Sequence, residues 1–191
     1  MTERMSTIDI DTLPAALAAD LDGAFPDLVH MLQDDVFSGA LRMTGNRADA
    51  EDIAQEAFVR AYRALSGYPA ARIHDLQVRG WVWTIAANLC RNRARSRARK
   101  PEVSLPEGMP IADTTPGPEQ VVLALDGSER LAAQVAMLPW AQREAVVLRH
   151  VVGLGYAEIA GALERPIGTV KADVHRALAR LREMVQPEEA R

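Results

Sequence analysis

The chain of 191 residues has room for one large domain or two small ones, and its net charge of −4 is mild. Aromatic residues are few, and no stretch alternates apolar and polar residues for long, so the sequence predicts an all-α fold. The single cysteine, Cys90, excludes an internal disulfide and a multi-cysteine zinc site, and we expect it to be an inert helix residue. The histidines have no metal-binding spacing, so we expect neither a metal nor a cofactor.

The charges are unevenly distributed along the chain. Residues 1–40 contain eight acidic residues and Arg4 as the only base among Lys and Arg, whereas residues 91–100 contain six basic residues and no acid. Such asymmetry favours separate surfaces for separate partners. No apolar run approaches the roughly 20 residues needed to cross a bilayer, and the acidic start lacks the order of a signal peptide. We therefore expect a cytoplasmic protein without membrane insertion.

The first 22 residues are acidic and lack a sustained period, which predicts a loosely held tail. Apolar residues from Phe25 to Ala40 then keep a helical period that ends near residues 44–46, where Gly and Asn suit a helix stop. A second helix is expected to begin with Asp49 as its N-cap. Its apolar face is predicted to lie in the core and contains Ile53, Ala57, Phe58, Ala61 and Leu65.

The opposite face of this second helix is acidic and amidic near its start. The residues on that face are Glu51, Asp52, Gln55 and Glu56. Acidic side chains are favoured there by the positive end of the helix dipole. Two interpretations remain open from the residues alone: the face is simply solvated, or it docks a basic partner.

A polar loop is expected up to residue 78, and the helix after it, about Arg79 to Arg99, has the most informative pattern. Its predicted core face consists of Val78, Trp81, Val82, Ile85 and Leu89. At 100° per residue, Trp83 lies about 140° from the centre of that face, near Asn88 and Arg91. An exposed tryptophan there would stack on bases while arginines hold phosphates. Packing against a neighbouring helix is the equal alternative for Trp83.

The composition changes at residues 101–118, which contain five prolines and no helical period. This stretch predicts a linker that ends the first domain. A helix bent around Gly127 and another over residues 141–152 follow. From Tyr156 to Arg182 two more helices are expected, broken at Glu164-Arg165-Pro166 because proline disfavours helix at the residue before it.

The two last helices have the pattern of a helix-turn-helix, whose second helix enters the major groove of DNA. The second helix has an apolar line at Val170, Val174, Leu178 and Leu181. Opposite this line lie Ala172, His175, Arg176 and Ala179, flanked by Thr169 and Lys171. A short, basic and sterically open face suits the major groove. An ordinary helical hairpin with a solvated basic face is the alternative.

Three segments in chain order resemble one protein family. They are DAEDIAQEAFVRAYRAL at 49–65, WVWTIAANLCRNRAR at 81–95, and LPWAQREAVVL with GLGYAEIAGALERPIGTVKADVHRALARLR within 138–182. Together they resemble the extracytoplasmic-function (ECF) group of the sigma-70 family of bacterial sigma factors. The resemblance implies a non-enzymatic, two-domain, all-α protein that binds core RNA polymerase and directs transcription initiation at promoters. Region 2 would cover residues 23–100 and region 4 residues 119–186, with tails at 1–22 and 187–191.

The resemblance also implies roles for individual residues. Region 2 would bind the clamp helices of polymerase through Asp49, Glu51, Asp52, Gln55 and Glu56. Its loop at 67–78 resembles the loop that captures a flipped base of the minus-ten element, and the accompanying helix carries Trp83, Asn88 and Arg91. Region 4 would touch the polymerase flap and read the minus-thirty-five element of promoter DNA through Arg149, Thr169, Lys171, His175 and Arg176. The linker resembles the family's connector, and an anti-sigma factor is the expected restraining partner.

The chain departs from the family pattern at two places. Many relatives have Ser-Arg where this chain has Ala172-Asp173, and relatives often carry an aromatic and a small apolar residue where this chain has Val78 and Gly80. A carboxylate facing the groove tends to repel phosphate unless it accepts from a cytosine amino group. Asp173 either gives a base preference or bonds to a neighbouring helix. The alternative functions are a free-standing helix-turn-helix regulator and, disfavoured by the lack of metal ligands, an enzyme of nucleic-acid metabolism.

Overall fold

The structure is a computed structural model that describes residues 9–99 and 127–185. Its regular structure over these ranges is helical, which confirms the predicted all-α class. The N-terminal group consists of α1 (Leu13–Ala19), α2 (Leu21–Thr44), α3 (Arg47–Ser66), α4 (Ala70–His74) and α5 (Val78–Arg99). The C-terminal group consists of α7 (Gly127–Met137), α8 (Trp140–His150), α9 (Tyr156–Leu163) and α10 (Ile167–Val185). The predicted linker, 101–118, lies outside the described residues.

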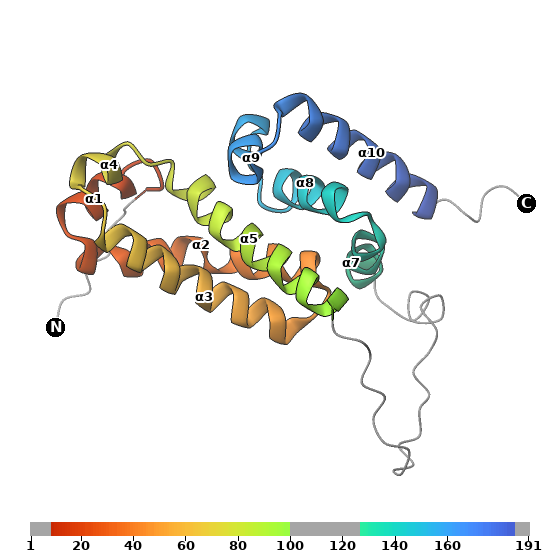
Figure 1. The fold of residues 1–191 in the computed structure, drawn as a ribbon, viewed down its shortest axis with the longest axis horizontal. Helices are drawn as coiled ribbons and strands as arrows, with labels where there is room; N and C mark the ends of the chain where they lie inside the picture. The colour runs from red at the N-terminus through yellow and green to blue at the C-terminus, as the bar shows by residue number, and fades with distance from the viewer. Residues whose placement is uncertain (1–8, 100–126, 186–191) are drawn as a thin grey trace, which may run out of the picture.

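The N-terminal group is a bundle of α2, α3 and α5, and α1 and α4 pack together at one end of it (Figure 1). Its core is formed by the apolar faces of these helices, including the residues predicted for α3. Gly45 ends α2 in the left-handed conformation, with φ 65°, which a glycine adopts without a Cβ penalty. The N-cap of α3 is Asn46, whose side chain accepts from the Asp49 amide at 2.9 Å. The predicted N-cap at Asp49 is therefore wrong by one turn.

Two short helices, α1 and α4, are found where the sequence predicted a loosely held tail and a polar loop. Leu13 and Leu17 of α1 are buried, and α1 packs against α2 and α4. Asp20 then caps α2 by accepting from the Gly23 amide at 3.0 Å. Within the expected polar loop, Ile73 of α4 is also buried. The loosely held tail is thus a wrong prediction for residues 13–22, and the N-terminal group begins at α1.

The C-terminal group contains the predicted helix-turn-helix as α9 and α10. Glu164 forms the corner in the left-handed conformation, with φ 51°. Proline at 166 precedes α10 directly, where its fixed φ suits a helix start. The side of α10 that holds Val170, Val174 and Leu181 is buried against α8 and α9, as the periodicity predicts. The opposite side is left open to solvent.

The two groups pack against each other, with α9 beside α5 and with α7 and α8 beside α2 (Figure 1). Side chains of one group therefore reach the backbone and carboxylates of the other. No helix in the described ranges combines the length and apolar character that a membrane span requires.

Candidate functional site

The outer face of α10 carries the residues that the sequence predicted for DNA contact. Thr169, Lys171, His175 and Arg176 are all exposed on this helix. Arg149 of α8 joins them through Tyr156: its Cζ lies 4.9 Å from the centre of the Tyr156 ring, and Lys171 Nζ lies 5.6 Å from the same centre. Arg149 is also fixed by a 3.0 Å hydrogen bond from Nη1 to the Leu154 carbonyl. The structure thus brings the five predicted residues to one side of the C-terminal group.

Asp173 lies on the buried side of this set. It is 4% exposed and forms ion pairs with Arg165 and, at 2.5 Å, with Arg176. Of the two roles left open by the sequence, bonding within the domain is the one that the structure shows. The ion pair of Arg165 with Asp173 was not predicted from the sequence, in which Arg165 was interpreted only as part of the break between the two helices.

Trp83 is a core residue: of the two positions left open by the sequence, packing against a neighbouring helix is the one observed, and its predicted contact with DNA is wrong. Its side chain is 0% exposed and lies between α5 and Gly39 of α2, where a Cβ would overlap the indole ring. A helical wheel with one buried face does not describe α5, because α2, α3 and α9 all pack against this helix. A fully buried ring has no free face for a base, so we withdraw Trp83 from the predicted DNA contacts.

Asn88 and Arg91 lie on the side of α5 that meets the C-terminal group. Arg91 donates to Asn88 Oδ1 at 2.8 Å and to Glu144 Oε1 of α8 at 2.9 Å. Glu144 is 2% exposed, and burial raises its pKa against the opposing effect of Arg91. The same surroundings raise the pKa of the buried Cys90 thiol to about 12, chiefly by desolvation and secondly through Glu144. Arg91 is therefore engaged within the protein in this structure.

An aromatic cluster lies where α4 leads into α5. Trp81 is half-buried rather than fully in the core, and its ring centre lies 6.0 Å from that of Tyr68. Arg72 Cζ stacks 3.7 Å from the centre of the Tyr68 ring. This cluster was not predicted from the sequence, although an aromatic residue and an arginine, Tyr68 and Arg72, stand close together within the expected loop. Of the two tryptophans at the start of α5, Trp81 has accessible surface beside the loop, whereas Trp83 is buried.

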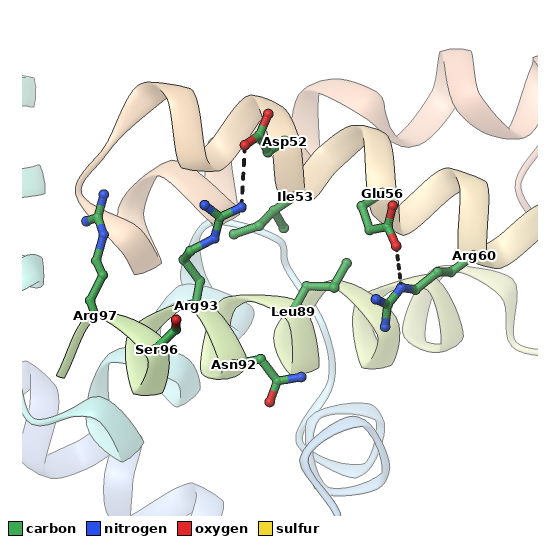
Figure 2. A pocket seen from close by; sticks show the side chains of 9 residues that line it. All are labelled: Asp52, Ile53, Glu56, Arg60, Leu89, Asn92, Arg93, Ser96 and Arg97. Carbon is green, nitrogen blue, oxygen red and sulfur yellow. Dashed lines mark hydrogen bonds and ion pairs between the residues drawn. The ribbon is translucent and has the colours of Figure 1, made fainter. Parts of the chain in front are cut away.

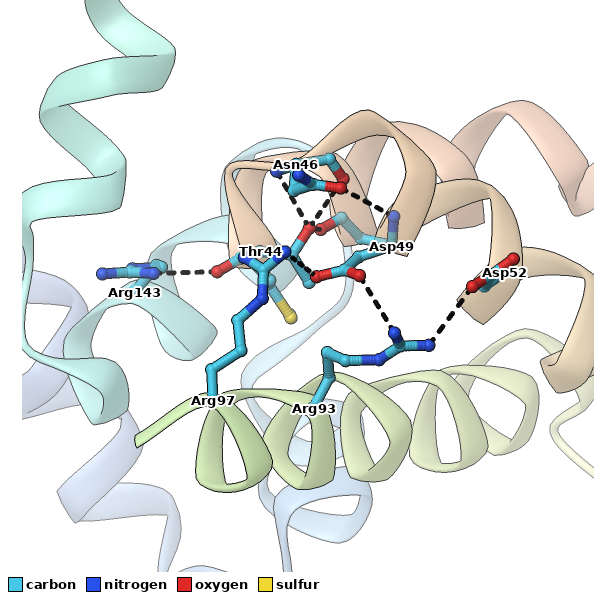
Figure 3. A network of polar contacts seen from close by, with 9 residues as sticks. Thr44, Asn46, Asp49, Asp52, Arg93, Arg97 and Arg143 are labelled. Atoms are coloured by element: carbon cyan, nitrogen blue, oxygen red, sulfur yellow. Dashed lines mark hydrogen bonds and ion pairs between the residues drawn. The ribbon is translucent and has the colours of Figure 1, made fainter. Parts of the chain in front are cut away.

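The acidic side of α3 is held by arginines of α5 at its first turn. Figure 3 shows Asp49 between Arg93 at 3.0 Å and Arg97 at 2.6 Å. Asp49 is 7% exposed, so most of its surface is taken up within the bundle. Arg93 also reaches Asp52, which remains exposed, at 3.4 Å. Asp49 differs in this way from the other residues of the predicted docking face.

The remaining residues of that face are accessible. Glu51 pairs with Arg47 at 2.9 Å and Glu56 with Arg60 at 2.8 Å, both one helical turn apart. Gln55 is exposed. Next to them, a hollow of about 420 Å³ runs between α3 and α5 (Figure 2). Its apolar floor includes Ile53 and Leu89, and its charged rim includes the residues Asp52, Glu56, Arg60, Arg93 and Arg97.

Two further arginines connect the groups, and no periodicity in the sequence predicted them. Arg143 of α8 donates to the Met43 carbonyl of α2 at 2.8 Å, and burial lowers its pKa. Arg79 of α5 pairs with Asp35 at 3.2 Å and donates to the Val152 carbonyl. These contacts depend on how the groups meet, which a helical pattern within one group does not encode.

Comparison with known families matches both groups of helices. The model of sigma-70 region 2 matches residues 28–100, and the model of sigma-70 region 4 matches residues 128–181. The ECF RNA polymerase sigma factor SigW of Bacillus subtilis is 34% identical over 174 residues, covering 85% of this chain and 89% of the relative. The ECF sigma factor SigE of Mycolicibacterium smegmatis is 35% identical over 163 residues, covering 84% of this chain and 61% of the relative.

Solved structures show the same fold. CnrH, in complex with the cytosolic domain of CnrY, is 25% identical with a TM-score of 0.67, covering 94% of this chain and 99% of CnrH. The sigma factor RpoE of Bartonella quintana, in complex with the anti-sigma factor NepR, is 24% identical with a TM-score of 0.66, covering 86% of this chain and 98% of RpoE. This chain therefore belongs to the sigma-70 family as an ECF sigma factor, which directs transcription initiation as part of the RNA polymerase holoenzyme.

Proposed function

We propose that the two groups divide the promoter between them. Region 4, proposed to span about residues 119–186 and described in the structure as the C-terminal group, reads the minus-thirty-five element as duplex with the outer face of α10. The N-terminal group captures and opens the minus-ten element with the segment 67–78, which contains α4, and with α5. The observation that carries this proposal is the shared exposed side of Arg149, Thr169, Lys171, His175 and Arg176. A recognition helix needs such a face to enter the major groove.

For the minus-ten element, the proposal relies on the surface around α4 and on two residues of α5. A base held out of the stack needs an aromatic or apolar surface and a nearby phosphate clamp. The cluster of Tyr68, Arg72 and Trp81 offers both kinds of group. Asn88 and Arg91 would contact the same strand further along α5, once Arg91 is released from Glu144.

The docking surface for core polymerase is proposed to be the exposed part of α3. Glu51, Asp52, Gln55 and Glu56 lie there beside the hollow shown in Figure 2. The face offers acidic side chains and a neighbouring apolar floor to a basic helical partner, whose cations would exchange with the arginines that pair with Asp52 and Glu56 here. Asp49 acts indirectly, by fixing α5 to α3. The protein would accordingly act in the cytoplasm, where the polymerase works, and the flap would contact the C-terminal group.

A restraining protein is a further proposed partner. CnrH and the Bartonella RpoE, whose folds resemble this chain over most of its length, were solved with CnrY and NepR respectively. We expect a protein of this type to bind this chain as well. A protein that is recovered with this chain in a pull-down from the native cell supports this proposal only if it prevents the purified chain from binding core polymerase in a titration.

The division of the promoter is tested by binding the holoenzyme to two separate probes. One probe is a duplex containing the upstream element, and the other is a single-stranded non-template oligonucleotide containing the downstream element. Lys171→Ala should weaken binding to the duplex alone, and Asn88→Ala to the oligonucleotide alone, each by roughly 1 kcal/mol for a lost polar or phosphate contact. Equal losses on both probes, or no loss on either, would contradict the division.

A further inference from the structure

A buried carboxylate holds one of the exposed arginines of α10. Asp173 Oδ1 lies 2.5 Å from Arg176 Nη2, and its other oxygen contacts Arg165 at the corner between α9 and α10. The Arg176 side chain is 55% exposed, whereas that of Asp173 is 6% exposed. One carboxylate therefore connects an arginine that is part of the fold to an arginine that reaches solvent.

Arg165 turns Asp173 into a fixed anchor. Its side chain is mostly buried, and its Nη1 donates to the Ala141 carbonyl at the start of α8 at 3.4 Å. Loss of one partner leaves a buried charge uncompensated, so the charged pair resists separation. Asp173 is thus held by a neighbouring part of the domain, independently of Arg176.

The anchor limits the orientations that Arg176 can adopt while leaving most of its donors available. A guanidinium has five N–H donors in a planar fork, and the contact with Asp173 uses one of its nitrogens. A side chain that is ordered before binding loses less freedom when it binds. Bidentate donation from arginine to guanine O6 and N7 is the commonest specific contact in the major groove.

We propose that Asp173 is a positioning residue for DNA recognition: together with Arg165 it fixes the guanidinium of Arg176 to contact one guanine of the upstream element. This inference depends on the proposed function of α10. It assigns no base contact to Asp173 itself. Two arginines balance its charge, which explains how a carboxylate is tolerated in a helix that meets phosphates.

The test is a sequence selection by the reconstituted holoenzyme containing the full chain. A duplex library randomised across the upstream element is bound, recovered and sequenced for the wild type, Asp173→Asn, Arg176→Ala and the double variant. Arg176→Ala should reduce the preference for guanine at one position by roughly tenfold. Asp173→Asn should reduce the preference at that same position several-fold, and should add nothing in the Arg176→Ala background.

The affinity of the holoenzyme for the average library sequence distinguishes a positioning role of Asp173 from a purely structural one. Asp173→Asn removes a negative charge, so its affinity for the average library sequence should stay equal or rise while the preference falls. Arg176→Lys keeps the charge but lacks the fork, and should lose the guanine preference with little loss of average affinity. Arg180→Ala, on an exposed arginine one turn further along α10, is the control and should lower affinity without changing any preference.

A second variant covers the case in which Asp173→Asn does not fold, as judged by thermal unfolding of the full chain. Arg165→Met releases the anchor while Asp173 and Arg176 remain, and it should lower the same preference. The inference is overturned if folded Asp173→Asn or Arg165→Met keeps the wild-type preference, or if Asp173→Asn lowers it further in the absence of Arg176. A wild-type holoenzyme that selects no upstream sequence would instead overturn the proposed function of α10.

Discussion

Trp83 joins α5 to α2 by filling the space left by a glycine. Its ring is fully buried against Gly39, and its indole N–H makes no hydrogen bond within the described residues. Trp83→Ala should lower the free energy of unfolding by about 3–5 kcal/mol, because it removes a large buried ring and leaves a cavity. Urea unfolding of the full chain measures this loss. Trp83→Phe is the matched control and should lose much less, since it keeps an aromatic ring and removes the unpaired N–H.

Gly39 supplies the other half of the same prediction. Gly39→Ala should destabilise the wild type by about 1–3 kcal/mol, because the added Cβ overlaps the Trp83 ring. In the Trp83→Ala background the same change should cost little or stabilise, since alanine favours helix over glycine. Additive effects of the two changes, or a Trp83→Ala variant as stable as the wild type, would show that the ring is not packed there.

The carboxylates of α3 fall into two kinds that differ in their partners. Asp49 is buried between Arg93 and Arg97, whereas Asp52 and Glu56 have accessible surface beside the hollow. Asp49→Ala should therefore destabilise the bundle, by about 1–2 kcal/mol after allowance for the partly exposed arginines. Asp52→Ala should remain within about 0.5 kcal/mol of the wild type.

Binding to core polymerase should depend on the exposed carboxylates Asp52 and Glu56 more than on the buried Asp49. Reversing Asp52 and Glu56 to Lys should weaken holoenzyme formation at least tenfold while the unfolding transition is retained, because like charges would face the basic partner. A titration of fluorescent chain with core polymerase measures this affinity. Asp11→Lys with Asp34→Lys makes the same charge change on other exposed positions and should leave core binding unchanged. If both double variants bind core normally, the docking face is misplaced.

Long periodic helices were predictable, whereas short helices and contacts between groups were not. The helix expected from Arg79 to Arg99 is observed as α5 from Val78 to Arg99, because its apolar residues recur at helical spacing from Val78 to Leu89, over about three turns. The helices α1 and α4 contain seven and five residues, too few to show a period. The sequence left Trp83 open between an exposed position and a packed one, because a helical wheel with one core face does not describe a helix that packs on several sides. The exposed face of α10 was found because its helix packs on one side.

The contact between the two groups determines what α5 can do. Arg91, a predicted DNA contact, is paired with the buried Glu144 of α8, and Arg79 and Arg143 add contacts to the opposite backbone. These contacts must separate before Arg91 can reach a phosphate. The structure is therefore a closed arrangement in which the C-terminal group covers part of the α5 surface that the proposed function requires.

A charge swap tests whether this pair holds the groups together. Glu144→Arg places a buried cation beside Arg91 and should open the molecule, seen as a larger radius of gyration in small-angle X-ray scattering. Arg91→Glu alone should also open the molecule, because it places a second carboxylate beside that of Glu144. The double variant restores opposite charges and should return the radius towards the wild-type value. An unchanged radius in both single variants, or no restoration in the double variant, would show that the pair does not control closure.

Transcription with purified components tests the central claim most directly. Core RNA polymerase from the same source would be incubated with genomic DNA fragments, with and without the full chain, and the transcript starts would be mapped. We predict starts that require the chain, share upstream and downstream sequence elements, and are lost with the Asp52→Lys and Glu56→Lys double variant. Failure of the chain to bind core polymerase, together with no chain-dependent start at any fragment, would contradict its function as a sigma factor.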